Sequence, residues 1–544
     1  MFFLGNASGH DFQFHLASWM DVAGQWREGI AYPRLAEWAN WGFGEPRFVF
    51  YPPASWMTGA ALGSVLPWRM VPGAFIWLAL VAAGMSMWKL ARDWMAGPQA
   101  VVAAVLFAAN PYHLVIAYYR SDFAELLAGA LLPLLIWAGL GVAREGWRRV
   151  PLLSVVFASI WLSNAPAAVI ATYSLGLILV TTCAVRRSFR PLVPGAAAIA
   201  AGFGLASFYI LPAAWEQRWV QIGQVAGENL RPAENFLFTR ANDAEFVLFN
   251  WKVSWVAVGV MVVSGIAAVF AARRRRDFRE LWWILAALGT VSVALMFSPS
   301  AFLWRGLPEL RFVQFPWRWL AVLDLVFAFF VAAAMSRAQR VASWLAILIV
   351  FATIVAAGRA MVEDAWWDSK DVPDMASGIR SGRGYEGANE YAPVGCDRWE
   401  LPGDPDDTAR PADVSPVPAP PIAKIELASD TLVPAKGVRL HVLRWSAERK
   451  VFTAETPAPV TLALRLVSYP GWEVNVDGKK TRADLRADTS QILLPLAPGA
   501  HRVDVRFRRT WDRIAGNAIS ALSAVTLLAF VGVFRRRRSG ESAT

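Results

Sequence analysis

Long apolar runs separated by short basic clusters constrain this chain more than any other feature of its sequence. A membrane-spanning helix needs about 20 mostly apolar residues, and eleven segments fit that length and composition. Only 17% of the residues are charged, whereas a soluble protein carries about 25%. The chain is therefore predicted to be an α-helical polytopic membrane protein. The predicted spans are residues 72–92, 98–119, 122–143, 150–165, 167–185, 193–213, 251–272, 280–298, 317–336, 341–358 and 513–534.

Basic residues follow every second predicted span. The formal net charge of +11 could suggest nucleic-acid binding, but clusters placed between apolar segments are typical of membrane topology. We therefore expect no nucleic-acid partner, and we expect the basic connections to face the cytoplasm. These basic positions are Lys89, Arg92, Arg144, Arg148, Arg149, Arg186, Arg187, Arg190, Arg273 to Arg276, Arg337, Arg340 and Arg535 to Arg538. The remaining connections are predicted to face outward: residues 1–71, 214–250, 299–316 and 359–512.

One apolar segment would break this alternation if it crossed the membrane. It is "YPPASWMTGAALGSVLPW" at residues 51–68, and it is short once its prolines are set aside. We predict a re-entrant helix or one lying in the outer interface, with Pro52 and Pro53 at its start, where proline is tolerated. The amino terminus then lies outside with no span before it, so we expect a further span upstream of Gly9.

The C-terminal part before the last span changes from apolar runs to short alternating segments. Residues 359–420 are rich in Pro, Asp, Gly and Ser and predict an extended, irregular linker. Residues 421–512 alternate with period two, and Asp477-Gly478 is a strong hairpin signal. We predict a small extracytoplasmic antiparallel β-sandwich there.

The predicted organisation has five parts. Residues 1–71 form a first outward loop with interfacial helices, residues 72–358 a transmembrane core, and residues 359–420 the linker. The sandwich occupies residues 421–512, and residues 513–544 are the final span with a basic cytoplasmic tail. The two cysteines, Cys183 in an apolar run and Cys396 in a polar one, are not expected to pair.

Charged residues in or near the outward ends of the spans need a reason, because charges at membrane depth cost about 2.5 to 3.5 kcal/mol each. Four groups of polar residues lie on the predicted outer side. Carboxylates and arginines converging on one side suggest a single outward-facing site. The groups are His10, Asp11 and His15; Arg120, Asp122 and Glu125; Arg240, Asp243 and Glu245; and Arg311, Gln314 and Arg318.

Several of these residues also have a purely structural interpretation. Asp11 and Asp122 each precede a predicted helix and are suited to cap it, and Glu125 would then stand in a favourable first turn. Arg318 lies between two tryptophans and is suited to anchor its span in the interface. Asp324, deeper in the same span, is suited to pair with a neighbouring helix.

A helix that begins near Phe12 would place Phe12, His15, Trp19, Ala23 and Trp26 on one face. With Asp21, Gln25 and Glu28 off that face, the pattern predicts an amphipathic helix lying on the membrane with its aromatic face on lipid. The two histidines lack the usual i, i+4 spacing of a helical zinc pair, and no third ligand is evident. A histidine metal site is therefore not favoured.

Five stretches of the chain carry a family resemblance. They are "GHDFQFH", "YPRLAEWANWGFGEPRFVFYPP", "NPYHLVIAYYRSDFAELLAGALLPL", "FVQFPWRWL" and "YPGWEVNVDGKK" followed by "LPLAPGAHRVDVRF". The chain resembles bacterial GT-C-fold membrane proteins of the YfhO and 6-pyruvoyl-tetrahydropterin-synthase-related group. The similarity runs along nearly the whole chain.

This resemblance implies a multi-span glycosyltransferase fold that uses a polyprenyl-phosphate-linked sugar at the outer face of the bacterial cytoplasmic membrane. The catalytic carboxylate of such enzymes lies in the first outward loop, which implies Asp11 here. The second outward turn matches Arg120, Asp122 and Glu125, and the "FPWR" element matches Pro316, Trp317 and Arg318. Two departures are the missing first span and Asn164, which stands where we expect a histidine.

Our hypothesis is glycosyl transfer with inversion, in which Asp11 acts as general base on an acceptor hydroxyl. The lipid phosphate would be held by Arg318, Arg120 or Arg240. We expect His10, His15, Asp122, Glu125 and Asp243 to bind substrate. A divalent metal, Mg²⁺ or Mn²⁺, on oxygen ligands is left open.

The expected partners are the lipid bilayer, the lipid-linked sugar and a glycan, lipid or protein acceptor. Two other functions are possible. A lipid or polysaccharide transporter predicts polar residues deep in several spans, which are few here apart from Glu125 and Asp324. A non-catalytic envelope assembly protein predicts that the sandwich, and not the carboxylates, carries the function.

Overall fold

The structure is a computed structural model of the 544-residue chain. It describes residues 6–240, 243–273, 278–335, 340–363, 366–401, 425–427 and 438–541. Arg274 to Arg276, Arg337 and residues 402–424 of the predicted linker lie outside the described residues.

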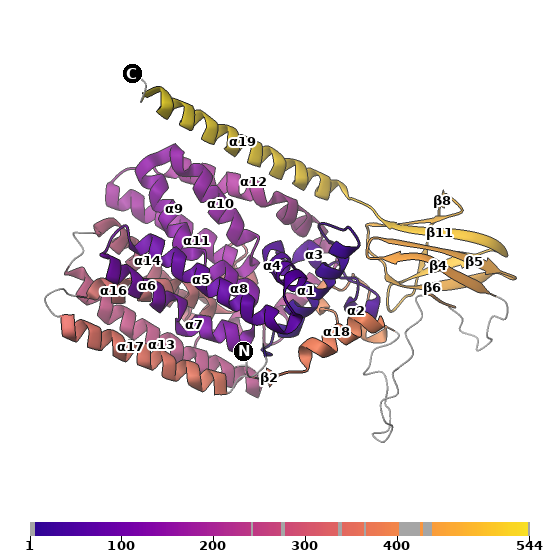
Figure 1. Cartoon of the computed structure of the whole chain (residues 1–544), viewed down its shortest axis with the longest axis horizontal. Helices are drawn as coiled ribbons and strands as arrows, with labels where there is room; N and C mark the ends of the chain where they lie inside the picture. Colours follow the sequence, from indigo (N-terminus) through magenta and orange to yellow (C-terminus); the bar gives the residue numbers. More distant parts are fainter. Residues whose placement is uncertain are drawn as a thin grey trace.

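A helix bundle forms the larger part of the molecule, as the apolar runs predict (Figure 1). Its long helices begin and end close to the predicted spans. The bundle helices are α5 (Val71–Ala91), α6 (Gly97–Ala108), α7 (Pro111–Leu114), α8 (Phe123–Gly129), α9 (Leu132–Glu145), α10 (Val150–Trp161), α11 (Ala165–Arg186), α12 (Leu192–Glu216), α13 (Ala244–Ala272), α14 (Arg279–Leu295), α15 (Ala301–Gly306), α16 (Leu320–Ala334), α17 (Arg340–Glu363) and α19 (Trp511–Glu541).

Nine helical stretches of the described residues are long and apolar enough to cross a membrane. A tenth results if Arg279–Leu295 and Ser298–Gly306, which meet at 93°, form one broken span. The stretch Phe123–Trp161 counts as one of the nine, yet Gly146 interrupts it with a φ of 60° and α8 at its start contacts α10 at its end. It therefore doubles back, and each of the eleven predicted spans has its own helix.

The two kinds of connection gather at opposite ends of the bundle. At one end Lys89 lies 4.5 Å from the Trp137 ring centre and Arg186 lies 2.6 Å from Glu280. These contacts bring the end of α5 to α9, and the end of α11 to the start of α14. At the other end the backbone N–H of Ala54 donates to the carbonyl of Leu162 at 2.7 Å. The predicted outward loops collect there.

A layer of short helices covers this second end and separates the bundle from the strands (Figure 1). It contains α1 (Phe12–Arg27), α2 (Ala39–Gly42), α3 (Arg47–Phe50), α4 (Pro53–Val65) and α18 (Asp371–Ser381). The predicted short helix at residues 51–68 corresponds to α4.

The prediction that the aromatic face of α1 rests on lipid is wrong. Phe12 and Trp19 are fully buried, and so are Asp21 and Gln25 off that face. The Trp19 ring stacks on Phe75 at 5.2 Å and lies 4.8 Å from Phe123. Helices α4 and α18 pack against α1, so protein covers the surface that the helical pattern assigned to lipid.

Two antiparallel sheets form the predicted C-terminal sandwich. The four-stranded sheet has the order β3-β6-β10-β9 and the five-stranded sheet the order β4-β5-β11-β7-β8. Both sheets contribute side chains to one apolar core, including Leu464 and Val503. The strands are β3 (Ile425–Leu427), β4 (Arg439–Ser446), β5 (Arg449–Thr456), β6 (Val460–Val467), β7 (Trp472–Val476), β8 (Lys479–Lys480), β9 (Asp484–Leu485), β10 (Gln491–Leu496) and β11 (Gly499–Phe507).

The predicted hairpin at Asp477-Gly478 is present. Val476 pairs with Lys479 across a two-residue loop, and φ is 51° at Asp477 and 78° at Gly478. Both central residues of a tight hairpin turn need a positive φ, which explains this residue pair.

The predicted irregular linker is partly folded. Within the described residues 366–401, strand β2 (Trp367–Asp368) pairs with β1 (Asn6–Ala7), and the amphipathic helix α18 follows it. The abundance of Pro, Asp and Gly hid these elements, because α18 gains its stability from packing on α1 and not from its composition. This segment also reaches the charged residues described next.

Candidate functional site

The first loop of the chain lies directly on the turn between α7 and α8. The backbone N–H of Asp11 donates to the carbonyl of Arg120 at 2.8 Å, and that of Gly9 donates to the Ser121 hydroxyl at 3.1 Å. A Cβ atom at Gly9 would collide with the carbonyl oxygen of Tyr119. Glycine is therefore needed for this close approach.

The turn that receives the loop has unusual backbone geometry. Residues Val115–Arg120 form the π-helix η2, and Ser121 follows in the left-handed region with a φ of 54°. Single π-helical turns occur frequently at functional sites. Here the turn ends the preceding helix and aims Arg120 and Asp122 toward Asp11.

Five charged residues meet at this point, and we call them the charged cluster: Asp11, Arg120, Asp122, Glu125 and Arg318. Arg120 Nη2 lies 2.5 Å from Asp11 Oδ2 and 3.9 Å from Asp122 Oδ2. Arg318 Nη2 lies 3.4 Å from Asp122 Oδ2, and its Nε lies 2.9 Å from Glu125 Oε2. Two arginines thus connect three carboxylates, and the five residues come from three separate parts of the chain.

Arg318 is held by the short helix η9 (Pro316–Trp319). Its Nη1 donates to the carbonyl of Val313 at 2.9 Å and to the side chain of Gln314 at 3.0 Å. Because Arg318 is only 3% exposed, its interpretation as an interfacial anchor is wrong. Arg318 holds the carboxylates of Asp122 and Glu125 in place.

The capping alternatives have different outcomes for the two aspartates. Asp11 precedes α1, but its side chain makes no capping hydrogen bond. Asp122 does cap α8, since its Oδ1 accepts from the N–H of Glu125 at 2.9 Å, and it also faces Arg318. Asp324 is fully buried in α16.

Asp11 and Arg120 differ from the rest of the charged cluster in their remaining capacity to bind. The Asp11 side chain is 34% exposed, against 4–8% for the other four side chains. Among the described residues, Nε and Nη1 of Arg120 are buried and have no hydrogen-bond partner. Buried unsatisfied donors are rare in native proteins, so this guanidinium is suited to take an anion.

Two residues of the first outward loop complete the surroundings of Asp122. His15 Nε2 lies 3.7 Å from Asp122 Oδ1, and His15 Nδ1 lies 3.4 Å from the Ser55 hydroxyl. Burial opposes ionisation of Asp122, but the nearby His15 imidazole and the charges of Arg120 and Arg318 lower its pKa. Asp122 is therefore held as a carboxylate.

Tyr51 belongs to the site and was missed from the sequence. Its ring lies 4.8 Å from Phe14 and 5.8 Å from His15. Burial and then the negative charges of Asp122 and Asp11 raise the pKa of Tyr51, so its hydroxyl keeps its proton. Tyr51 lies in "RFVFYPP", within one of the stretches that carry the family resemblance, and this was a signal for the site. It was missed because the stretch resembles the apolar start of a helix.

Aromatic side chains line the side of the charged cluster that faces α13. His10 lies 5.8 Å from Tyr119 and 5.7 Å from Phe249, and Phe249 stacks on Tyr119 at 4.9 Å. The Arg120 guanidinium lies 5.0 Å from the Phe315 ring centre. Burial, and then the charge of Arg120, lowers the pKa of His10, which favours a neutral imidazole at this edge.

The loop before α13 is not brought into the charged cluster. Arg240 is exposed, and Asp243 caps α13 by accepting from the N–H groups of Glu245 and Phe246 at 2.8 and 3.1 Å. Glu245 Oε1 lies 3.9 Å from His10 Nε2. Asn164, at the expected histidine position, caps α11 through the N–H of Ala167 at 2.9 Å.

A second buried polar network contacts α1, and sequence reasoning missed it. Arg47 Nε lies 2.6 Å from Glu45 Oε1, and its Nη1 donates to the Ser18 hydroxyl at 3.0 Å. The hydroxyl of Tyr385 donates to Asp21 Oδ2 at 2.8 Å. These bonds connect α1 to the segment after α18 and hold the loop that carries Asp11.

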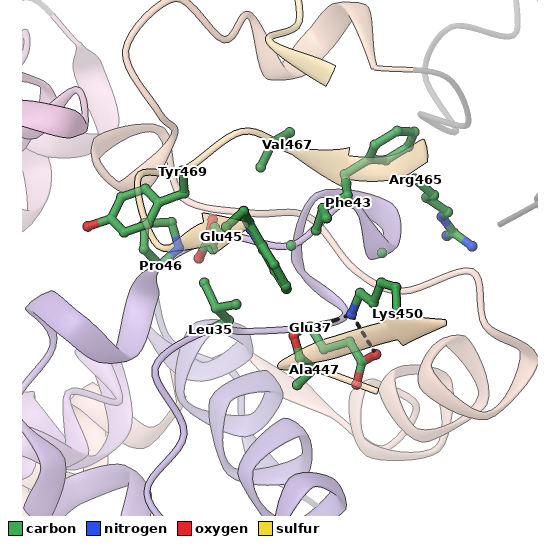
Figure 2. A pocket seen from close by; sticks show the side chains of 14 residues that line it. Leu35, Glu37, Phe43, Glu45, Pro46, Ala447, Lys450, Arg465, Val467 and Tyr469 are labelled. Atoms are coloured by element: carbon green, nitrogen blue, oxygen red, sulfur yellow. Dashed lines mark hydrogen bonds and ion pairs between the residues drawn. The ribbon is translucent and has the colours of Figure 1, made fainter. Parts of the chain in front are cut away.

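A small cavity lies where the sandwich meets the loop before α3. Figure 2 shows Glu37 and Lys450 facing each other across it, with Lys450 Nζ 3.5 Å from Glu37 Oε1. Burial raises the pKa of Glu37 to about 7, although the Lys450 ammonium lowers it. The cavity volume is about 20 Å³, which is room for about one water molecule. This is a docking contact and not a substrate site.

Metal ligands were considered for the same carboxylates. Within the part of the chain that the structure describes, no group of three or more His, Cys, Asp or Glu side chains is arranged to hold a metal ion. Cys183 and Cys396 are both free and buried, as expected.

Comparison with known protein families gives a match over more than half of the chain. No curated protein matches the chain. Residues 48–362 match the family model described as "6-pyruvoyl-tetrahydropterin synthase related domain; membrane protein". The matched region contains Arg120, Asp122, Glu125 and Arg318, but neither Asp11 nor the sandwich. The chain therefore belongs to the family of membrane proteins with a 6-pyruvoyl-tetrahydropterin synthase related domain.

Proposed function

We propose that the protein is a GT-C-type glycosyltransferase that moves a sugar from a polyprenyl-phosphate-linked donor to a cell-envelope acceptor. The observation that carries this proposal is the pairing of a partly exposed carboxylate, Asp11, with an arginine whose buried Nε and Nη1 have no partner among the described residues. Asp11 can act as the base, and the arginine beside it can bind the phosphate anion. Transfer of a sugar from a phosphate requires both.

The proposed reaction is a displacement at the anomeric carbon with inversion. An oxygen of Asp11 accepts the proton of the acceptor hydroxyl while that hydroxyl oxygen forms its bond to the anomeric carbon. The bond between the anomeric carbon and the phosphate oxygen breaks, and the electron pair leaves with the lipid phosphate. Arg120 stabilises the charge that develops on this phosphate.

The other residues of the charged cluster position these two. Arg318 fixes Asp122 and Glu125, and Asp122 stands 3.9 Å from Arg120. The protonated hydroxyl of Tyr51 is suited to donate a hydrogen bond to the sugar or to Asp11. His10 and the aromatic residues toward α13 are suited to border the path of the lipid donor.

Sidedness and localisation are part of the proposal. The charged cluster lies at the bundle end opposite to the basic connections around Arg186 and Glu280. Positively charged connections favour the cytoplasmic side. This supports an active site and a sandwich on the outer face of the bacterial cytoplasmic membrane.

The test is a deletion of the gene, complemented with the wild-type chain, Asp11→Asn or Asp371→Asn. Asp371 of α18 is a matched control because it is a carboxylate near the same loop. It accepts a hydrogen bond at 3.3 Å from Gln13, and Gln13 is two residues after Asp11 in the sequence. Lipid-linked sugars and surface glycans are compared by mass spectrometry at equal protein levels in the membrane.

We expect a lipid-linked sugar to accumulate in the deletion strain and with Asp11→Asn, together with loss of a surface glycan unit. Wild type and Asp371→Asn should restore both. If Asp11→Asn restores both as well, the proposal is wrong. If the protein is instead a transporter, its deletion would leave the lipid-linked sugar on the cytoplasmic side of the membrane. A membrane-impermeant glycosidase cannot reach the sugar there, which distinguishes this outcome from a sugar that accumulates on the outer face.

A further inference from the structure

A large polar cavity lies between the helical layer and the sandwich, away from the charged cluster. Its volume is about 630 Å³, within the range of roughly 300 to 1,000 Å³ that is usual for ligand sites. The residues that matter for its chemistry are Gln221, Gln224, Asn389, Asp397, Trp399 and Asp488. They come from the loop after α12, from the segment after α18 and from the sandwich.

The cavity lining has hydrogen-bonding capacity that the protein does not use. Among the described residues, the side-chain amide of Gln224 makes no hydrogen bond. The Asn389 side chain uses its Oδ1 to accept from Arg398 and leaves its amide NH₂ group open. Asp397 uses only Oδ1, to accept from the Trp399 N–H at 3.0 Å. Amides and carboxylates with open positions can exchange several hydrogen bonds with hydroxyl groups.

The net charge of the lining disfavours an anionic ligand. Asp397 and Asp488 both face the cavity. Arg398 is the cation of the lining; its Nη2 is paired with Glu386 at 2.7 Å, while its buried Nη1 has no partner among the described residues. The lining therefore has an excess of negative charge, which disfavours phosphate and acidic sugars. Neutral polyhydroxyl compounds fit this charge, because their hydroxyls donate to carboxylates.

Trp399 provides an apolar surface in this polar lining. It is 47% exposed, and the Arg398 guanidinium lies 3.7 Å from its ring centre, which fixes the position of the indole. An ordered indole beside amides and carboxylates is suited to the apolar C–H face of a sugar ring.

The cavity and the charged cluster are separated by the short helix η10 (Asn389–Tyr391). Asn389 lines the cavity, whereas the Tyr391 ring stacks on Phe50 at 5.9 Å and lies 6.3 Å from Phe14, beside His15. A ligand that extends from the cavity toward Asp11 would have to pass this packed row of aromatic rings.

We infer that this cavity binds a neutral oligosaccharide, and that it is the subsite for the glycan acceptor. The acceptor role rests on the proposed function, but sugar binding does not. The cavity would hold the acceptor chain beyond the hydroxyl that reacts at Asp11.

The test uses the purified full-length chain in detergent and measures binding of neutral trisaccharides of glucose, mannose, galactose and N-acetylglucosamine by calorimetry. We expect at least one of them to bind, and tri-galacturonate to bind at least about tenfold more weakly. Trp399→Ala and the double variant Gln224→Ala/Asn389→Ala should each weaken binding about tenfold. Trp366→Ala is the matched control, because Trp366 is 69% exposed and lies outside the cavity.

Three results would overturn the inference: no neutral trisaccharide binds, both cavity variants bind like wild type, or tri-galacturonate binds best. Asp11→Asn should bind the sugar like wild type. If it loses binding, the sugar lies at the charged cluster and not in this cavity. Binding that persists in a chain with no transferase activity would refute the proposed function and leave this site standing.

Discussion

Two buried arginine–carboxylate groups lie at the same end of the molecule, and the difference between them supports the proposed role of one. The first is the charged cluster around Arg120. The second joins α12, the sandwich and α19, where Arg513 Nε and Nη2 each lie 2.7 Å from a carboxylate oxygen of Glu216. The Tyr469 hydroxyl also donates to Glu216, at 2.5 Å.

Both arginines are buried, but their hydrogen-bonding capacity is not equally satisfied. Arg513 makes a bidentate pair, and within the described part of the chain none of its buried nitrogens lacks a partner. Arg120 leaves Nε and Nη1 unbonded among the described residues, and its partner Asp11 is 34% exposed. A saturated pair stabilises a junction, whereas unsatisfied donors beside an accessible carboxylate indicate a place for a ligand.

The largest effect is expected from Arg120→Met, which keeps side-chain volume but removes the charge. Loss of a donor to the developing charge should lower the transfer rate by about 10²–10³-fold. The unfolding free energy should change by only about 1 kcal/mol, because Asp11 is accessible to water and Asp122 keeps Arg318. Radiolabelled sugar transfer and thermal unfolding of the same preparation check both values. If Arg120→Met loses much stability while its folded molecules keep normal activity, Arg120 has the same structural role as Arg513, and the proposed difference between them is wrong.

Arg513→Met should show the opposite behaviour. It leaves Glu216 buried without its partner, which should lower the unfolding free energy by about 3–5 kcal/mol. The activity of the folded molecules should remain within about twofold of wild type. The double variant Glu216→Gln/Arg513→Met removes both charges and should recover much of the stability. Thermal unfolding in detergent distinguishes the three chains.

Glu37 provides a pH test of how the sandwich is docked. Its pKa in the folded chain is about 7, raised by burial above its ordinary 4.5. Its contribution to stability is therefore fully present below about pH 4.5 and lost as the pH rises through about 7, by about 3 kcal/mol in total. Lys450, Asp21 and Glu28 are the charged groups around it.

The measurement is the melting temperature of wild type and of Glu37→Gln between pH 5 and pH 8. Wild type should lose stability relative to Glu37→Gln over this interval. Parallel curves for the two chains would show that Glu37 is ionised throughout and that the docking contact does not titrate.

The smallest effect is expected in the loop before α13. Arg240 is exposed and outside the charged cluster, so Arg240→Ala should leave transfer within about twofold of wild type. Asp243→Ala should cost about 1 kcal/mol of stability through the lost cap of α13, with the same activity. A tenfold loss of activity in Arg240→Ala would show that Arg240 takes part in the reaction.

The parts of the fold that were predicted correctly depend on local patterns. Hydropathy over about 20 residues predicts each span regardless of its neighbours, and the turn at Asp477-Gly478 needs only its own two residues. The interpretation of α1 failed because its aromatic face is suited equally to lipid and to a protein interior. Helix α18 was hidden because its stability comes from packing.

The sequence by itself determined the eleven apolar segments, the alternation of basic connections and the β-sandwich, since each is a property of adjacent residues. Only the tertiary structure decided which polar residues meet. Asp11 and Arg120 are separated by 109 positions, and Glu125 and Arg318 by 193. It places Arg240 and Asp243 away from the charged cluster, and Tyr51 beside His15. Charges interact through distance in space, and that distance is fixed by how the helices pack.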